Sequence, residues 1–242
     1  MINFRHSRHS KLQALISYFL FNYLQFGDAE NNWIVLDTLG QLIKTKERTV
    51  PIFWSNWGAK SGTYNFNNNL YYWNNYNDTV YEILPDLSIS ASFLISPGEH
   101  RLPRGQFDPQ QKLSQYLFIE AMFEAKKYLV IKYFFNGEKL IAFIEKESRK
   151  SYLPRCEESD NAGIINDLDG GPLFYPRSYL TMNGREYIVG LLDPYLLKTH
   201  VATTGFKEIN PRSPEKKKEL EQLANSLKET DNPVLVMVRL KE

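Results

Sequence analysis

The sequence predicts an all-β fold, built as a β-propeller of antiparallel blades with one amphipathic helix near the C-terminus. Among its 242 residues are 15 Phe, 15 Tyr and 4 Trp, and aromatic side chains favour pleated, packed surfaces. Short strand-like runs alternate with turn residues along most of the chain. These runs recur in units of three or four, at intervals of about 40 to 60 residues, which is the spacing of propeller blades. We therefore expect a single propeller domain over residues 1–242, either partial or with few blades.

The first predicted unit covers residues 17–47 and holds three strands: Ser17–Phe26, Trp33–Asp37 and Gln41–Lys46. Basic residues before the first run give it some likeness to a signal peptide. Polar residues interrupt the run, however, and no small-residue cleavage site follows it. The run is also too short and polar to span a membrane. We expect a strand here, and the chain shows no convincing export signal.

The second unit, residues 64–95, reads as four short strands with tight polar turns: Tyr64–Phe66, Leu70–Asn74, Thr79–Leu84 and Ser88–Ile95. An aromatic, loop-like passage precedes it. The third unit, residues 117–154, follows a short helical turn expected near Gln110–Gln115.

The hairpin Tyr128–Lys146 dominates this third unit. Its two apolar runs are joined by Asn136-Gly137, the residue pair that a type I′ turn favours because both positions need φ > 0. One predicted face of the hairpin is wholly apolar and the other is half apolar. The hairpin must therefore be covered on both faces, as the interior of a blade would be.

The fourth unit, residues 178–240, opens with the strands Ser178–Met182 and Glu186–Leu192 around an Asn183-Gly184 turn. Asp193-Pro194 predicts a short helical turn to Lys198. A helix over residues 214–229 should begin with Ser213 as its cap and Pro214 in its first turn. Leu220, Leu223, Ala224 and Leu227 form its apolar stripe, and Val234–Leu240 is the last predicted strand.

The later part of the chain resembles a known family. The stretches that carry the resemblance are Asn166–Gly171 with Pro172–Pro176, Pro214–Leu220, Leu223–Glu229, Asp231–Leu235 and, earlier, Asp78–Tyr81. They are similar to motifs of the six-bladed β-propeller proteins abundant in Bacteroides and relatives, which are exported and largely of unknown function. The resemblance extends from about Trp33 onward.

The resemblance implies a periplasmic or cell-surface protein, of which this chain looks like roughly the last four blades. Four blades of a six-bladed ring leave open sheet edges, and open edges invite pairing with another chain. We therefore expect self-association if the ring does not close on itself.

The charge balance and the cysteine count exclude several classes of function. The 29 basic and 28 acidic residues give a net charge of +1, which argues against nucleic-acid binding. The lone Cys156 excludes an intrachain disulfide and a thiolate metal cluster. No nucleotide, dinucleotide or serine-hydrolase fingerprint is present, so no cofactor is indicated.

Two groups of residues are candidates for a site. Trp54, Trp57, Tyr72 and Trp73 could present flat ring faces to a sugar, although such residues more often pack blade against blade. Asp167-x-Asp169-Gly170 has the carboxylate spacing of a calcium loop, but the further ligands that calcium needs do not follow. We favour the interpretation that the two Asp side chains stabilise a turn, and a metal site is the weaker alternative.

We therefore predict a non-catalytic module that binds a small molecule, a glycan or a protein. The alternatives are an enzyme or accessory protein acting on polysaccharide, and a truncated propeller fragment without function. No residue is assigned a catalytic role.

Overall fold

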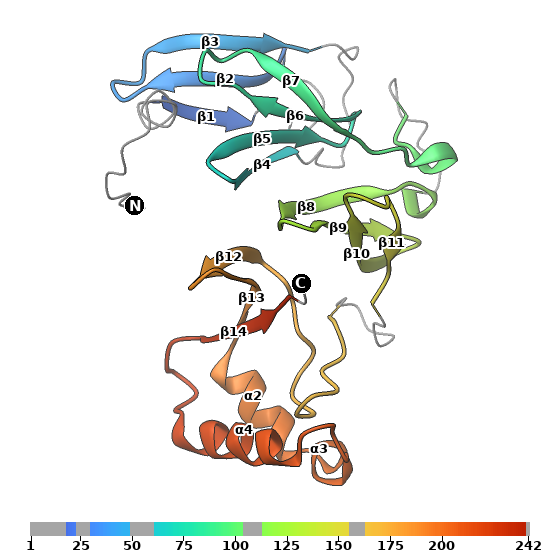
Figure 1. Ribbon diagram of the computed structural model, residues 1–242, viewed down its shortest axis with the longest axis vertical. Coiled ribbons are helices and arrows are strands. Elements are labelled where there is room, and N and C mark those ends of the chain that lie inside the picture. The colour runs from blue at the N-terminus through green and yellow to red at the C-terminus, as the bar shows by residue number, and fades with distance from the viewer. Residues whose placement is uncertain (1–17, 23–29, 49–60, 104–112, 155–162, 241–242) are drawn as a thin grey trace. The chain divides into compact units, whose positions relative to one another are not determined.

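The computed structural model describes residues 18–22, 30–48, 61–103, 113–154 and 163–240, and these residues form four antiparallel sheets and a small group of helices (Figure 1). By compactness the chain divides into two units, Met1–Met122 with Lys132–Gly137, and Phe123–Ile131 with Glu138–Glu242. The first two sheets belong to the first unit and the fourth to the second, while the boundary passes through the strands of the third sheet.

The first two sheets follow the chain order of their strands. Sheet one consists of β1 (Tyr18–Asn22), β2 (Asn31–Asp37) and β3 (Leu42–Glu47). Sheet two consists of β4 (Ser61–Phe66), β5 (Asn69–Asn74), β6 (Asn77–Ile83) and β7 (Ile89–Leu94). Each strand pairs antiparallel with the next one along the chain. The sheets are therefore simple meanders, built by local turns.

Sheets three and four repeat this arrangement. Sheet three has the order β11-β10-β9-β8, formed by β8 (Phe118–Glu124), β9 (Tyr128–Phe135), β10 (Glu138–Glu145) and β11 (Ser151–Tyr152). Sheet four has the order β12-β13-β14, formed by β12 (Ser178–Met182), β13 (Arg185–Leu192) and β14 (Val234–Arg239). The helices stand between β13 and β14 in the sequence.

The strands predicted from the sequence are confirmed within the described residues, where their ends shift by up to three residues. Of the first predicted strand, Ser17–Phe26, only Tyr18–Asn22 is described. The largest shift is in β4, which begins at Ser61 rather than Tyr64. The helical turn expected near Gln110–Gln115 is a short 3-10 turn, η2 (Leu113–Gln115), and a similar turn, η1, covers Gly98–His100. The mostly antiparallel β class is thus established. The assignment of residues 1–242 to one propeller domain stays a prediction.

The Asn136-Gly137 turn has the conformation that the sequence indicates. Both residues have positive φ, 54° and 82°, as a type I′ turn requires. Leu129, Val130 and Ile131, three successive residues of β9, are all buried. Because successive side chains of a strand point to opposite faces, the hairpin is covered on both faces, as predicted.

In the first unit the core lies between sheets one and two. Trp33 and Val35 of β2 pack with Tyr72 of β5 and Ile83 of β6, and each of these side chains is at most 2% exposed. Leu87, after β6, completes the cluster. The two sheets are therefore held face to face by apolar side chains, in the manner of packed β-sheets.

In the second unit a similar core lies between sheets three and four. Phe123, Val130 and Ile141 of sheet three pack with Ile188 of sheet four, and Phe174, from the segment before β12, fills the space beside them. An atom added at the Cα of Gly190 would lie 2.5 Å from the carbonyl oxygen of Tyr175. Glycine at this position therefore lets the segment before β12 lie close against β13.

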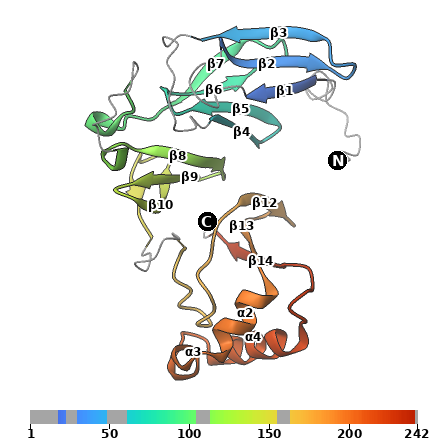
Figure 2. The same ribbon diagram turned by 180° about the vertical axis from the view of Figure 1, so that it is seen from behind.

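Three helices form a small subdomain of the second unit: α2 (Pro194–Ala202), α3 (Thr204–Glu208) and α4 (Pro214–Ser226). Viewed from behind, α2 and α4 lie side by side (Figure 2). Leu197 and Val201 of α2, Phe206 of α3 and Ala224 of α4 make their shared core. The Lys198 ammonium group donates to the carbonyl oxygens of Ala224 and Leu227, 3.1 and 3.0 Å away, and so binds the unpaired end of α4.

The helices differ from the predictions in four respects. α2 runs to Ala202 rather than ending near Lys198, because the inward-facing Leu197 and Val201 continue its buried side. α4 ends at Ser226, three residues earlier than predicted, and Ser213 makes no side-chain capping hydrogen bond. α3 was not predicted. Among the residues that the structure describes, no helix is long and apolar enough to cross a membrane.

Candidate functional site

The predicted aromatic site is only partly within the described residues. Trp54 and Trp57 lie outside them. Tyr72 and Trp73 are both buried, at 2% and 3% exposure. The Tyr72 hydroxyl donates to the carbonyl oxygen of Asn32, 3.2 Å away, and accepts from Asn74 Nδ2 at 3.3 Å. The ring of Trp73 lies against Gly62, where an added Cβ would meet it at 2.7 Å. In this structure both residues act as packing elements, and their role in ligand contact stays a prediction.

The Asp167–Gly171 loop is a hydrogen-bonded turn. Asp169 Oδ1 accepts from Asn166 Nδ2 at 2.6 Å and from the backbone N–H of Gly171 at 2.8 Å. The Asp167 carboxylate lies 3.1 Å from Arg212 Nε. One oxygen of each carboxylate is thus engaged within this protein, Asp169 Oδ1 in the turn and Asp167 Oδ2 with Arg212. Among the described residues, no group of three or more His, Cys, Asp or Glu could hold a metal ion.

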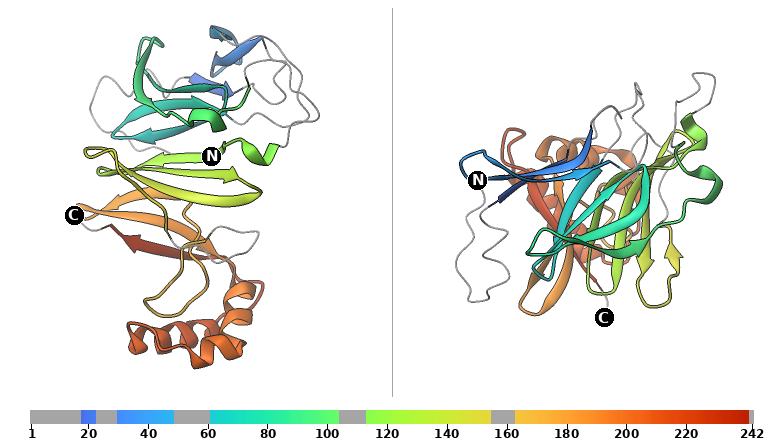
Figure 3. Two further views of the ribbon diagram at one scale, coloured as in Figure 1. Left: turned by 90° about the vertical axis from the view of Figure 1, so that its right-hand side faces the viewer. Right: turned by 90° about the horizontal axis from the view of Figure 1, so that it is seen from above.

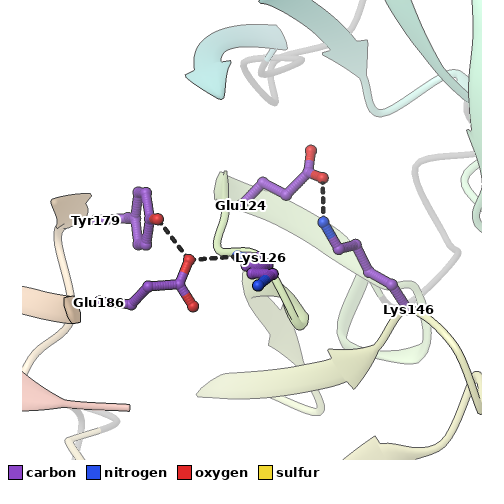
Figure 4. Close-up of polar contacts among 5 residues, drawn as sticks. All are labelled: Glu124, Lys126, Lys146, Tyr179 and Glu186. Atoms are coloured by element: carbon purple, nitrogen blue, oxygen red, sulfur yellow. Dashed lines mark hydrogen bonds and ion pairs between the residues drawn. The ribbon is translucent and has the colours of Figure 1, made fainter. Parts of the chain in front are cut away.

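A polar group in the second unit was not foreseen from the sequence (Figure 4). It comprises Glu124 at the end of β8, Lys126 between β8 and β9, Lys146 just after β10, Tyr179 on β12 and Glu186 on β13. We call it the Glu124–Glu186 polar group. Turns bring these ends together, since β8, β9 and β10 run alternately up and down.

Glu124 is paired directly with Lys146. The Lys146 ammonium nitrogen lies 2.6 Å from Glu124 Oε1, and the two side chains are 22% and 4% exposed. An isolated carboxylate at this depth would be costly, because it loses its hydration. The cation supplies both a charge-assisted hydrogen bond and charge compensation. Glu124 and Lys146 therefore form a buried pair that suits a structural role.

Tyr179 and Glu186 form the other half of the group. The Tyr179 hydroxyl donates to Glu186 Oε1 at 2.5 Å, and the same oxygen accepts the backbone N–H of Lys126 at 2.9 Å. A phenol has one proton to give, so the Thr181 hydroxyl, 2.8 Å away, must be the donor to Tyr179. Partial burial, followed by the Glu186 carboxylate, raises the pKa of Tyr179. The phenol therefore stays neutral at physiological pH and serves as a hydrogen-bond donor.

Side-chain-to-backbone hydrogen bonds link each sheet to the next one along the chain. Tyr72 joins sheet two to sheet one through Asn32. Within the first unit, Asn75 joins sheet two to β8: its Nδ2 donates to the carbonyl oxygen of Ile119 at 2.9 Å, and its Oδ1 accepts the N–H of Ile119 at 2.7 Å. Glu186 joins sheet four to the β8–β9 turn through Lys126. The strand pairing defines the protein's class, which is that of a mostly antiparallel β protein.

The chain belongs to a family described as "Domain of unknown function (DUF4934)", whose model matches residues 2–239. Its fold is similar to the crystal structure of a "Putative exported protein" from Bacteroides fragilis NCTC 9343, with 20% sequence identity and a TM-score of 0.58. The match covers 92% of this chain and 62% of the other, so this chain spans less than two thirds of that protein. The comparison with curated proteins found no match. No specific function follows from these likenesses.

Proposed function

We propose that the protein is a non-catalytic binding module, folded as a β-propeller or a substantial part of one, with its ligand at the central mouth. The observation that carries the proposal is the set of links between successive sheets, through Tyr72, Asn75 and Glu186. Blades of a propeller are small antiparallel sheets, each packed beside the next along the chain. The apolar cores between sheets one and two and between sheets three and four support the same arrangement.

The likeness to the Bacteroides fragilis protein supports a larger ring. The match covers 62% of that protein, and we propose that the four sheets here are four blades of a six-bladed ring. Because that protein is named as exported, we propose that this one also acts in the periplasm or at the cell surface. Fractionation of cells that naturally produce the protein tests this location, and recovery in the cytoplasm would refute it.

The carboxyl groups support binding rather than catalysis. A glycosidase needs one carboxylic acid whose pKa is raised, so that it can donate a proton. Hydrogen bonds from the Ser88 hydroxyl and backbone lower the pKa of Asp86, and the Ser148 hydroxyl with Lys127 lowers that of Glu145. Glu124 is paired with Lys146, and Asp78 with Arg101. The lowered pKa values of Asp86 and Glu145 do not suit a general acid, and the ion pairs give Glu124 and Asp78 structural partners.

Trp54 and Trp57 are the ring faces that we propose for ligand contact, with a glycan as the ligand class. Aromatic rings offer apolar faces that stack on sugar rings, and Trp54 and Trp57 are only three residues apart in the sequence. Tyr72 and Trp73, which are buried, would take part only where binding uncovers them.

Titration calorimetry against a panel of soluble polysaccharides tests this function, with reducing-end release measured in the same samples. We expect saturable binding without release. Replacing Trp54 and Trp57 by Ala should weaken that binding at least about tenfold, as loss of aromatic anchors commonly does. The control is Tyr152→Ala, which removes an aromatic side chain that is 49% exposed elsewhere. Release of reducing ends would refute the non-catalytic assignment, and equal binding by all variants would refute the aromatic site.

A further inference from the structure

The sequence contains two Asn-Gly pairs, Asn136-Gly137 and Asn183-Gly184, and each forms the tip of a hairpin. The second pair ends the β12–β13 hairpin, which is orange in Figure 3. An asparagine before glycine is open to attack by the backbone, because glycine has no side chain to shield its nitrogen. The two pairs share this chemistry, so the structure around each pair decides how fast it reacts.

The reaction replaces the side-chain amide by a carboxylic acid. The backbone nitrogen of the glycine loses its proton, attacks Cγ of the asparagine and closes a succinimide ring. The bond from Cγ to the side-chain nitrogen breaks, and this nitrogen leaves with the proton as ammonia. Water then adds to either ring carbonyl and reopens the ring, which yields aspartate or isoaspartate. Asparagine is a thermolabile residue in proteins for this reason.

The reacting atoms of both pairs are accessible. All four residues are exposed and have positive φ, 54° and 82° in the first pair and 51° and 72° in the second. No described residue accepts the N–H of either glycine, and none forms a hydrogen bond with either asparagine side chain. Ring closure requires rotation about the asparagine backbone, so each turn must open locally before it can react.

Contacts from outside the hairpin hold the first turn closed. The backbone N–H of Asn136 donates to the carbonyl oxygen of Ser114, 2.8 Å away. The Phe135 ring packs edge-on against the His100 ring, with centroids 4.6 Å apart. Opening of this turn therefore costs a hydrogen bond and a ring contact in addition to the strand pairing.

The second turn lacks such support among the described residues. Met182 pairs with Arg185 across the turn, and both are exposed, as is Thr181 before them. No described residue outside the hairpin forms a hydrogen bond with Asn183 or Gly184. β12 is also an edge strand of its sheet. Few contacts therefore resist local opening at this end of the hairpin.

We propose that Asn183 is a site of spontaneous deamidation in the folded protein, whereas the contacts of its turn protect Asn136. Each event adds a negative charge at the tip of the β12–β13 hairpin. The isoaspartate product also lengthens the backbone of a turn whose register the Met182–Arg185 pair defines. The inference goes beyond the proposed function and does not depend on the ligand.

Mass spectrometry of the full chain, incubated at mildly alkaline pH and digested with trypsin, measures both sites in one sample. Cleavage releases Ser178–Arg185 and Tyr133–Lys139, so each asparagine lies in its own peptide. We expect the first peptide to acquire the mass of the acid at least about fivefold faster, the factor expected for one hydrogen bond lost on opening. A sample digested without incubation gives the background.

The chain unfolded in urea is the control for intrinsic reactivity. Both asparagines should react at similar rates there, because the contacts that distinguish them are gone. His100→Ala tests the protection directly: loss of the ring contact should speed deamidation of Asn136 and leave the rate at Asn183 unchanged. Circular dichroism verifies that this variant remains folded, and Asn183 in the same molecule is its reference.

Three results would overturn the proposal. The first is a folded chain in which Asn183 keeps its amide as long as Asn136 does. The second is an unfolded chain in which the two rates already differ by the same factor, since the sequence alone would then explain the difference. The third is an unchanged rate at Asn136 in His100→Ala. Glycan binding is measured separately, so the proposed function stands or fails independently of these results.

Discussion

Lys146 and Glu124 are separated by 22 residues in the sequence, yet the ammonium nitrogen of one lies 2.6 Å from the carboxylate of the other. The pair sits where β8 ends and β10 has just ended. Lys146 therefore reaches across the end of the hairpin to a carboxylate that has little access to water. Lys146 thereby compensates the negative charge of Glu124 in the Glu124–Glu186 polar group.

Lys146→Met should destabilise the protein strongly. The variant keeps the apolar stem of the side chain but leaves Glu124 as a buried carboxylate without its cation. Removing one partner of a buried pair costs about 3 kcal/mol of unfolding free energy, measurable by urea denaturation at pH 7. The control is Lys216→Met, because Lys216 and Glu219 form an exposed pair, with side chains 55% and 60% exposed. Exposed pairs contribute little, so equal effects of the two variants would contradict the prediction.

Gly190→Ala should also destabilise the protein, through steric overlap. The added methyl group would lie 2.5 Å from the backbone oxygen of Tyr175 and 2.9 Å from the Phe174 ring. A backbone atom cannot rotate away, so β13 and the segment before β12 must separate, at a cost of about 2 kcal/mol.

Gly205→Ala is the matched control for this variant. Gly205 lies in α3, where an added Cβ has no neighbour within 4 Å. Alanine has the higher helix propensity, so this variant should gain about 0.5 kcal/mol. Thermal and urea unfolding of both variants measure the difference. A neutral Gly190→Ala would show that the close approach of the two segments is not needed.

The strands could be predicted from residue patterns within short segments of the sequence. The contacts between residues far apart in the sequence could not be predicted. Asn136-Gly137 and Asn183-Gly184 specify tight turns through their own backbone preferences, and all four residues have positive φ. In contrast, Asn75 meets Ile119 at a separation of 44 residues, and Lys126 meets Glu186 at 60. No spacing rule connects residues so far apart, so the polar links between sheets could not be predicted.

The helices show the same limit on a smaller scale. α3 has only five residues and a weak apolar pattern. It exists because the Thr203 side chain accepts the N–H of Phe206, and because Phe206 is buried with Leu197 and Val201. The end of α2 depends on that same core. At Asp169 the sequence pattern favoured a turn, and the Asp169 side chain does accept the backbone N–H of Gly171. Ligand contact by Trp54 and Trp57 stays a prediction.

The buried hydroxyl of Tyr72 should make stability fall at alkaline pH. Burial raises the pKa of Tyr72 well above its usual value near 10, with smaller opposing effects from hydrogen bonds to Asn74 and Ser61. Above pH 10 the unfolded chain loses this proton while the folded chain keeps it. The free energy of unfolding therefore decreases as pH rises, by about 1.4 kcal/mol per pH unit for one such group. Below pH 10 both states are protonated and the contribution is complete.

Tyr72→Phe tests this coupling. At pH 8 the variant should lose about 1 kcal/mol, because the hydrogen bond to the Asn32 oxygen is gone. Between pH 10 and pH 11 its stability should decrease less steeply than that of the wild type, since the group that titrates has been removed. Tyr195→Phe, at a residue that is 54% exposed, is the control and should leave the slope unchanged. Parallel slopes for wild type and Tyr72→Phe would refute the assignment.

Gly137→Ala isolates the cost of backbone conformation in the hairpin. Gly137 has a φ of 82°, and an added Cβ would meet no atom within 4 Å. Any loss of stability must therefore come from the left-handed backbone itself, at about 1–2 kcal/mol for a residue with a Cβ. Gly184→Ala, at a φ of 72° in the β12–β13 turn and equally open, should lose a similar amount. Asn136→Gly should be nearly neutral, because glycine adopts the same φ without strain. Urea unfolding of the three variants measures these differences, and a stable Gly137→Ala beside a destabilised Gly184→Ala would show that the two turns do not share one conformation.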